Sequence, residues 1–151
     1  MKRPLTPALL CALFLTLCAC GGTGEEPAAD ISTAGTGGSI NVTVLPAESS
    51  IYSEEDIDAA VETILNYFGE SENFSGCTLT KISYAGDAVN QREAGFLDQY
   101  GGDELIVLTS SFDVDSSGGD GSLNANSTYS GWNWILVRDH GGDWRHVDHG
   151  Y

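Results

Sequence analysis

Basic residues are scarce in this sequence, and their scarcity excludes one class of partner. The 151 residues include 6 Lys and Arg against 22 Asp and Glu, and the formal net charge is −16 at pH 7. A chain with so few cations has no basic patch with which to bind nucleic acid or anionic lipid head groups. The composition instead indicates an acidic, solvated surface with a weak attraction for divalent cations.

Long apolar runs are also lacking, apart from one short run near the start of the chain. Ala8–Leu17 follows the basic residues Lys2 and Arg3, and it is too short to span a bilayer as a mature helix. This pattern is typical of a signal peptide, and an ordinary secretory signal is one interpretation.

The residues that follow favour a lipoprotein signal. Leu17-Cys18-Ala19-Cys20 resembles a bacterial lipobox, in which the cysteine after the cleavage site carries the lipid. Cys18 fits less well, because Leu17 would occupy the small-residue position before it. We therefore expect residues 1–19 to be a lipoprotein signal peptide and Cys20 to carry palmitate or a similar acyl chain. This anchor would hold the protein at the outer face of the cytoplasmic membrane, in the bacterial cell envelope.

Cysteine is too rare for a disulfide framework. Of the four cysteines, two would leave with the signal peptide and Cys20 would carry the lipid, so only Cys77 remains. A lone cysteine is most often a small buried hydrophobe, and we expect this role for Cys77. Cleavage also removes two basic residues, which leaves 4 basic residues against 22 acidic ones and a formal charge of −18.

The composition divides the mature chain into two parts. Gly, Ala, Thr and acidic residues dominate residues 21–38, as is typical of a flexible linker. We therefore interpret residues 20–38 as the lipidated cysteine and its tether. Residues 39–151 are enough for a single domain with one hydrophobic core.

The clearest secondary-structure pattern predicts a long helix over residues 53–69. Ser53 can cap it, Asp56 lies at the third helical position as in a capping box, and Gly69 provides a stop. Apolar residues recur at helical spacing and form one stripe, which is most simply a core-facing side: Ile57, Ala60, Val61, Ile64, Leu65 and Phe68.

The other elements are mainly strands, and they define the fold class. Strand patterns occur at residues 40–45, 77–86, 104–114, 131–139 and 143–151. The first of these ends at Pro46, which indicates an edge strand. A short helix is expected over residues 90–102, with Asn90 and Glu93 as its cap pair. Together these elements predict an α+β domain in which a long N-terminal helix packs on a curved, mainly antiparallel sheet.

One strand is apolar on both sides. Trp132, Trp134 and Leu136 alternate with Ile135 and Val137, so only one of these faces can pack on the long helix. The other face needs a cover, for which the short helix, the N-terminal strand, a partner and a ligand are all candidates.

Several stretches resemble known proteins over about residues 39–151. The closing WNWILVRDHGGDWRHVDHGY resembles the last two strands of the cystatin-like cone folds, the superfamily of nuclear transport factor two and ketosteroid isomerase. The stretches IYSEEDI, GCTL, YAGD and SSFDVDSSGGDGSLN, with the GY ending, resemble a group of bacterial lipoproteins of unknown function. The resemblance implies a cone-shaped sheet, but that superfamily contains isomerases, dehydratases, transport adaptors and binding modules, so it does not fix the function.

The catalytic pattern of that superfamily does not map onto this chain. The isomerase has an aspartate base beside an oxyanion hole of Tyr and protonated Asp in an apolar cavity. Asp87, Asp103 and Tyr84 are available here, but none of them lies in a recognisable motif of the family. This departure argues against an enzyme.

A loop rich in Asp and Gly forms the main candidate site. Asp113, Asp115 and Ser117 have the spacing of oxygen ligands at the start of a calcium loop, with a turn glycine next and the Gly119 carbonyl after it. Asp120 and Asn124 could add oxygen ligands, although an EF-hand would have Glu in place of Asn124 and helices at its flanks. The simpler interpretation is a long acidic hairpin loop.

Two further groups of residues have the chemistry of binding sites. Loops of this length often bind partners, and the side chains that would form such a surface are Leu123, Tyr129 and Trp132. His140, His146 and His149 are possible zinc ligands. However, His146 and His149 are three residues apart on an expected strand and should point to opposite faces, so we expect exposed surface residues there.

These observations favour a non-enzymatic, lipid-anchored extracytoplasmic binding or accessory module. Its partners would be the membrane, through the lipid anchor, and an unknown protein or small ligand, but not nucleic acid. Two alternatives stay open: a cone-fold enzyme that uses a carboxylate in a small pocket, and an envelope interaction domain stabilised by calcium.

Overall fold

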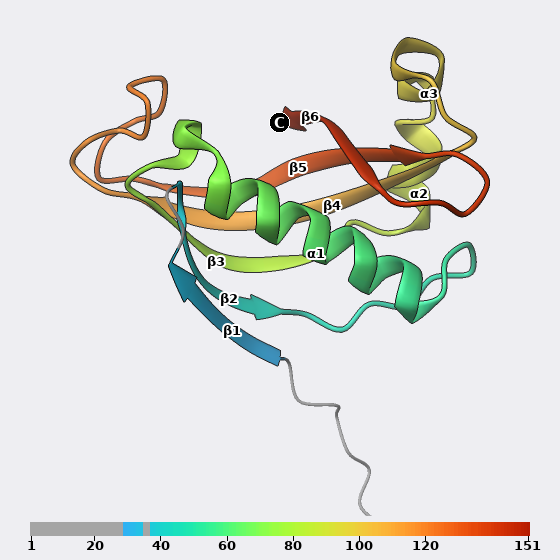
Figure 1. Cartoon of the computed structure of the whole chain (residues 1–151), viewed down its shortest axis with the longest axis horizontal. Coiled ribbons are helices and arrows are strands. Elements are labelled where there is room, and N and C mark those ends of the chain that lie inside the picture. The colour runs from blue at the N-terminus through green and yellow to red at the C-terminus, as the bar shows by residue number, and fades with distance from the viewer. Residues whose placement is uncertain (1–28, 35–36) are drawn as a thin grey trace, which may run out of the picture.

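The computed structural model describes residues 29–34 and 37–151, which form helices on both sides of one sheet (Figure 1). The elements in chain order are β1 Ala29–Ala34, β2 Ser39–Val44, α1 Glu54–Glu70, the 3₁₀ turn η1 Glu72–Phe74, β3 Cys77–Tyr84, α2 Asp87–Arg92, α3 Gly95–Tyr100, β4 Glu104–Val114, β5 Thr128–Arg138 and β6 Arg145–Gly150.

The six strands lie in the sheet in the same order as in the sequence. Only β2 and β3 are parallel, and α1 connects them, while every other neighbouring pair is antiparallel. The prediction of an α+β domain is therefore confirmed. The strand expected at residues 40–45 is not at the edge, because β1 pairs along its outer side.

Part of the segment that we assigned to the tether is folded. β1 pairs with β2 over its whole length, and the amides of Gly37 and Gly38 donate to the carbonyls of Gly69 and Phe68 at the end of α1. The tether prediction is therefore wrong for these residues. The reason is that the last carbonyls of α1 need hydrogen-bond donors, and the amides of Gly37 and Gly38 provide them. Only a residue without a Cβ fits at position 38 against the Phe68 ring.

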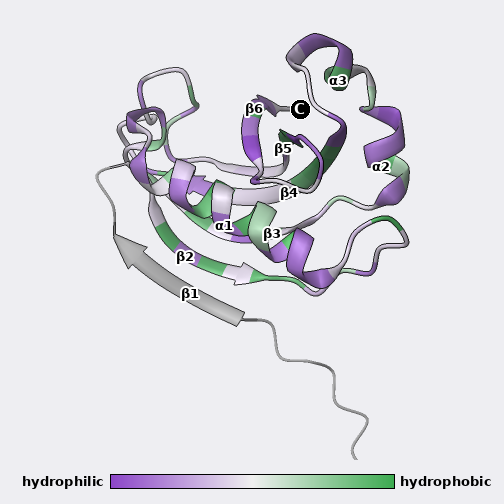
Figure 2. Cartoon of the chain, turned by 45° about the vertical axis from the view of Figure 1, so that its right-hand side comes forward, coloured by the Kyte–Doolittle hydropathy of each residue, from purple (hydrophilic) through white to green (hydrophobic). Residues whose placement is uncertain are grey.

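The capping box and apolar stripe of α1 occur as the sequence predicts. The Ser53 hydroxyl accepts from the Asp56 amide, and the Asp56 carboxylate accepts from the Ser53 amide. Apolar and hydrophilic residues alternate along the helix, as expected for a helix with one buried side (Figure 2). The core beneath α1 is filled by aromatic side chains, of which Phe68, Phe112 and Trp134 are fully buried.

Two short helices cover the opposite face of the sheet. Val89, Phe96 and Leu97 of α2 and α3 pack against a second apolar cluster that Leu105, Val107, Ile135 and Val137 form on β4 and β5. This packing answers the question of what covers the second apolar face of β5.

The single helix expected over residues 90–102 is instead two helices, and its cap residue has another role. Asn90 is buried within α2: its amide nitrogen donates to the Leu105 carbonyl, and its oxygen accepts from the Val107 amide. This side chain thus bonds to β4 as a neighbouring strand would, a contact that no local pattern indicates.

Candidate functional site

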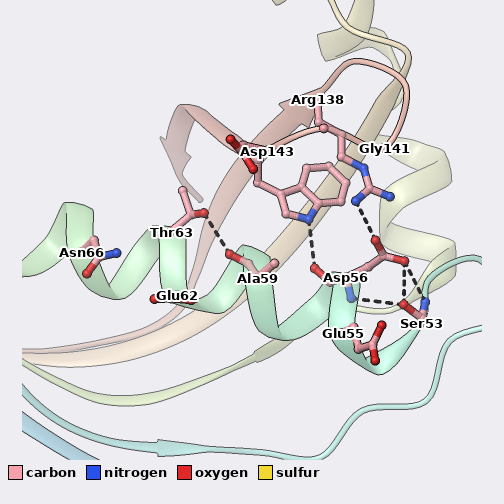
Figure 3. Close-up of a pocket in the computed structure, with 12 residues that line it drawn as sticks. Ser53, Glu55, Asp56, Ala59, Glu62, Thr63, Asn66, Arg138, Gly141 and Asp143 are labelled. Atoms are coloured by element: carbon pink, nitrogen blue, oxygen red, sulfur yellow. Dashed lines mark hydrogen bonds and ion pairs between the residues drawn. The ribbon is translucent and has the colours of Figure 1, made fainter.

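A groove runs between α1 and the turn that joins β5 to β6. Its volume is about 430 Å³, and we call it the α1 groove. Figure 3 shows the residues that line it: Ser53, Glu55, Asp56, Ala59, Glu62, Thr63 and Asn66 from the start and middle of α1, and Arg138, Gly141, Gly142, Asp143 and Trp144 from β5 and the turn.

Arg138 joins the two walls of the groove. Its Nη1 lies 2.6 Å from Asp56 Oδ1, and its Nε lies 2.6 Å from Glu104 Oε2. The guanidinium carbon also lies 4.2 Å from the centre of the Trp144 ring, whose indole nitrogen donates to the Asp56 carbonyl. The Ser53 hydroxyl and this guanidinium lower the pKa of Asp56, so the pair is charged at neutral pH.

The remaining charge of the groove is negative. Glu55, Glu62 and Asp143 line it and are exposed, and Asp56 adds a fourth carboxylate. Arg138 is the only basic residue in the lining, and two carboxylates already neutralise it. The groove therefore presents unpaired negative charge between two walls, an arrangement that attracts a positively charged group.

The structure does not bring the predicted calcium ligands together. Asp113 accepts from the Thr128 hydroxyl, Asp115 accepts from the amide and hydroxyl of Ser117, and Asp120 accepts from the Ser122 amide. The bonds from Ser117 lower the pKa of Asp115. Each carboxylate thus closes its own turn or strand end.

The rest of the described domain also lacks a cluster of metal-ligating side chains. Among residues 29–34 and 37–151, no three His, Cys, Asp or Glu side chains are grouped closely enough to hold a metal ion. The Gly119 carbonyl, which was predicted as a calcium ligand, therefore has no such cluster of ligands beside it among the described residues. The loop packs as structure: a Cβ on Gly119 would lie 3.0 Å from the Asn73 carbonyl and 3.6 Å from Cys77 Sγ.

The three predicted contact residues all pack on the core, and two of them, Tyr129 and Trp132, lie beside each other. Tyr129 stacks on buried Phe112 with ring centres 5.2 Å apart, and Trp132 meets both rings edge to face. Leu123 is also half-buried and packs against the main core. The Trp132 indole nitrogen is buried without a hydrogen-bond partner among the described residues. These side chains close one end of the core more than they form an open surface.

The expectation of exposed histidines on opposite faces holds for His140 in its exposure but is wrong for His146 and His149. His146 and His149 lie on the same face of β6, with His146 Nε2 and His149 Nδ1 3.3 Å apart. The register between β5 and β6 shifts at this point, which adds one residue to β6 and brings the two rings to one side. His140 is exposed in the turn, where its Nδ1 lies 2.7 Å from Asp103 Oδ2.

No family model, curated protein or solved structure matches this chain. In the part of the chain that the structure describes, there is also no helix with the length and apolar character that crossing a bilayer requires.

The residues considered for catalysis have other partners. The carboxylate of Asp87 accepts from Ser49, Ser50 and the Tyr84 hydroxyl, and the serine bonds hold its pKa far below the ordinary value. Burial, followed by the bond to Asp87, raises the pKa of Tyr84 to about 12. Cys77 is buried as predicted, and burial raises the pKa of its thiol to about 11.

Sequence reasoning missed the groove because its walls are 82 positions apart. One signal was present: residues 20–151 contain only four basic residues, so an arginine at the end of an apolar strand would be expected to find carboxylate partners. Which carboxylates they are depends on how α1 crosses the sheet, and this is a property of the packed fold.

Proposed function

We propose that this protein is a non-enzymatic, lipid-anchored binding module of the bacterial cell envelope, and that the α1 groove binds a lysine- or arginine-bearing segment of a partner protein. The observation that carries the proposal is the charge of the groove. Three exposed carboxylates line it without a basic partner in the lining, since Arg138 is already paired. A cationic side chain placed between the walls would be attracted by several carboxylates at once.

The charge of the whole chain supports the same kind of partner. A mature charge of −18 steers positively charged molecules towards the surface and repels anionic ones. Between the two walls of a groove the field is stronger than on an open surface, because less water screens it. The partner would thus be guided by the net charge and held by the groove.

The filled core supports a binding function over an enzymatic one. α1 lies across a curved sheet (Figure 1), and the pocket of a cone-fold enzyme would be expected in the space between them. Here Phe68, Phe112 and Trp134 occupy that space, and Asp87 and Tyr84 bond to each other and to nearby serines.

The lipid anchor supports the envelope location. The signal peptide, Cys20 and most of the tether lie outside the described residues, so this part of the proposal depends on the sequence pattern of residues 1–20. An anchored domain whose groove faces away from an anionic membrane would meet envelope proteins rather than lipid.

The test is a titration of the full chain, in neutral detergent, with a short peptide that contains three lysines. We expect binding that weakens as salt increases, and about threefold to tenfold weaker binding for the variant with both Glu62→Gln and Asp143→Asn, because each exposed charge contributes up to about 1 kcal/mol. The matched control removes two exposed charges remote from the groove, with Asp98→Asn and Asp120→Asn. Equal weakening in both variants would show that net charge alone, and not the groove, attracts the peptide.

A further inference from the structure

A bulge in β6 places two histidine rings on the face that packs against α1. The strand pairing joins Trp134 to His149 and Leu136 to His146, and cross-strand partners share a face of the sheet. Ile135 pairs with Asp148, so Val147 is the extra residue in β6. A regular strand would point the two histidines to opposite faces.

The two rings have the geometry of a pair of metal ligands. His146 Nε2 and His149 Nδ1 lie 3.3 Å apart, the ring centres lie 5.2 Å apart, and the ring planes differ by 19°. Two imidazole nitrogens that bind one zinc ion at tetrahedral geometry lie about 3.3–3.4 Å apart, with ring centres about 5.2 Å apart when both rings lie in one plane with the metal. The same separation fits a bent N–H···N hydrogen bond, which joins the two rings when no metal is bound.

A third donor lies beside the two nitrogens. The backbone carbonyl oxygen of Asp148 is 3.0 Å from His146 Nε2. Because this donor belongs to the main chain, a count of ligating side chains does not include it. Two nitrogens and one oxygen leave at least one position for water, a ligand set typical of zinc and copper sites.

The surroundings hold the rings in place before any metal arrives. The Tyr67 ring of α1 lies 4.2 Å from the centre of His146, and the Trp134 ring lies 5.2 Å from that of His149. The His149 amide donates to the Asp148 carboxylate, whose other oxygen accepts from the Tyr100 hydroxyl. A site whose ligands are already ordered loses little conformational entropy when it binds.

The charge beside the rings suits a cation. The Asp148 carboxylate lies next to His149, whose amide donates to it, and provides negative charge that would offset the charge of a bound ion.

We propose that His146, His149 and the Asp148 carbonyl form a binding site for a divalent late first-row metal ion, either zinc or copper. The ion binds His146 Nε2 and His149 Nδ1, the ring proton of each imidazole resides on its other nitrogen, and water fills the open positions. Copper binds more tightly than zinc at such a site, and the hard cations calcium and magnesium do not bind. The site is separate from both the α1 groove and the loop of Asp113 to Asp120.

Tryptophan fluorescence provides a direct test. Trp132 and Trp134 have ring centres 5.8 Å and 5.2 Å from that of His149, so a copper ion at the site quenches their emission. The experiment titrates the full chain in neutral detergent, with its accessible thiols blocked, using Cu²⁺ alone and then Zn²⁺ alone as a competitor. We expect quenching that saturates at one ion per chain, is reversed by a large excess of zinc and is unaffected by a hundredfold excess of calcium.

Histidine variants locate the ion. His146→Phe and His149→Phe keep an aromatic ring but remove the ligand, and each should weaken copper binding at least about tenfold, since even the loss of an indirect contact to a metal ligand costs about that much. His140→Phe is the matched control, because these are the three histidines of the chain and His140 is exposed in the turn. Unchanged affinity in the first two variants, or equal loss in the control, would overturn the proposal.

A measurement on the unaltered protein covers the case in which a variant does not fold. The ¹⁵N spectrum of the imidazoles reports which nitrogens bind zinc. We expect zinc to shift Nε2 of His146 and Nδ1 of His149 and to leave His140 unchanged. A spectrum in which no histidine nitrogen shifts at saturating zinc refutes the site.

Discussion

Arg138 Nη1 lies 2.6 Å from Asp56 Oδ1, and this ion pair ties the last residue of β5 to the first turn of α1. The Asp56 side chain also accepts from the Ser53 hydroxyl and amide, so one carboxylate both caps the helix and holds it to the sheet. The arginine side chain is only 10% exposed, whereas the two carboxylates that it contacts are 30% and 32% exposed. The guanidinium is thus largely shielded from water, whereas its two carboxylate partners are partly solvated.

Removal of this guanidinium should destabilise the whole domain. Arg138→Met keeps the apolar stem of the side chain but leaves Asp56 and Glu104 without their cation and removes the stacking on Trp144. We expect a loss of about 2 kcal/mol in the free energy of unfolding, less than for a fully buried pair because both carboxylates reach water. Urea denaturation at pH 7 measures it.

The matched control is Arg92→Met, which removes a guanidinium whose side chain is 65% exposed and whose partner is the adjacent Glu93. We expect a change within about 0.5 kcal/mol there. If the two variants lose the same stability, the link between α1 and β5 contributes no more than a surface ion pair.

Asp87 should make stability depend on pH in the acid range. Its carboxylate accepts from Ser49 Oγ at 2.6 Å, from the amide and Oγ of Ser50, and from the Tyr84 hydroxyl, and these bonds lower its pKa. The folded state therefore binds its proton less readily than the unfolded state does. The stability from these bonds is present above the unfolded pKa of about 4 and is lost as pH falls further.

The measurement is the melting temperature from pH 7 to pH 2 for the native chain and for Asp87→Asn. The variant should be less stable at pH 7 and should lose less on acidification, so that the two curves approach each other as pH falls from 4 towards 2. Asp58→Asn, at an exposed position of α1, is the control and should follow the native curve. Parallel curves for the native chain and Asp87→Asn would contradict the role given to these bonds.

Elements with local signals were predictable from the sequence, and elements made by long-range contacts were not. The cap, stripe and approximate bounds of α1 follow from residues within one helix, and β4 has the bounds that its apolar run predicts. By contrast, Asn90 has a pattern typical of a cap but bonds to β4, and the second wall of the α1 groove comes from β5 and the turn after it. Neither partner is near in sequence.

The histidine pair shows why one residue of register matters. Alternation places residues three apart on opposite faces, and this rule fails only where a bulge adds a residue. Nothing in DWRHVDHGY signals the bulge at Val147, because its cause is the pairing with β5. The prediction that His146 and His149 point to opposite faces thus failed for a geometric reason and not a chemical one.

Lipidation makes a prediction about the cysteines near the start of the chain. In a bacterial host that processes lipoproteins, the full chain should incorporate labelled palmitate and partition into detergent. Cys20→Ser should abolish both, whereas Cys18→Ser should leave both unchanged, because Leu17 is a poor residue at the cleavage site. Label retained by Cys20→Ser and lost by Cys18→Ser would move the anchor to Cys18.

The loop of Asp113 to Asp120 packs on Gly76, where an added Cβ would have no room. Gly76 has φ of +76°, and a Cβ there would clash with Ser117 Oγ and lie 2.6 Å from Asp115 Oδ1. Gly76→Ala should therefore destabilise the domain by about 2 kcal/mol or more, from backbone strain together with displacement of the Asp115 turn. Gly121→Ala separates these two causes, because Gly121 also has a positive φ but its Cβ would have open space.

The same pair of variants decides whether calcium matters to this loop. Because Asp115 is occupied by Ser117 and Asp113 by Thr128, we expect both variants to lose the same stability in millimolar calcium as in chelator. A calcium site would give a different result: the ion would raise the melting temperature of the native chain, and Gly76→Ala would reduce that rise more than Gly121→Ala, since only the former displaces a ligand. The two outcomes distinguish a loop that closes on its own hydrogen bonds from one that closes on a cation.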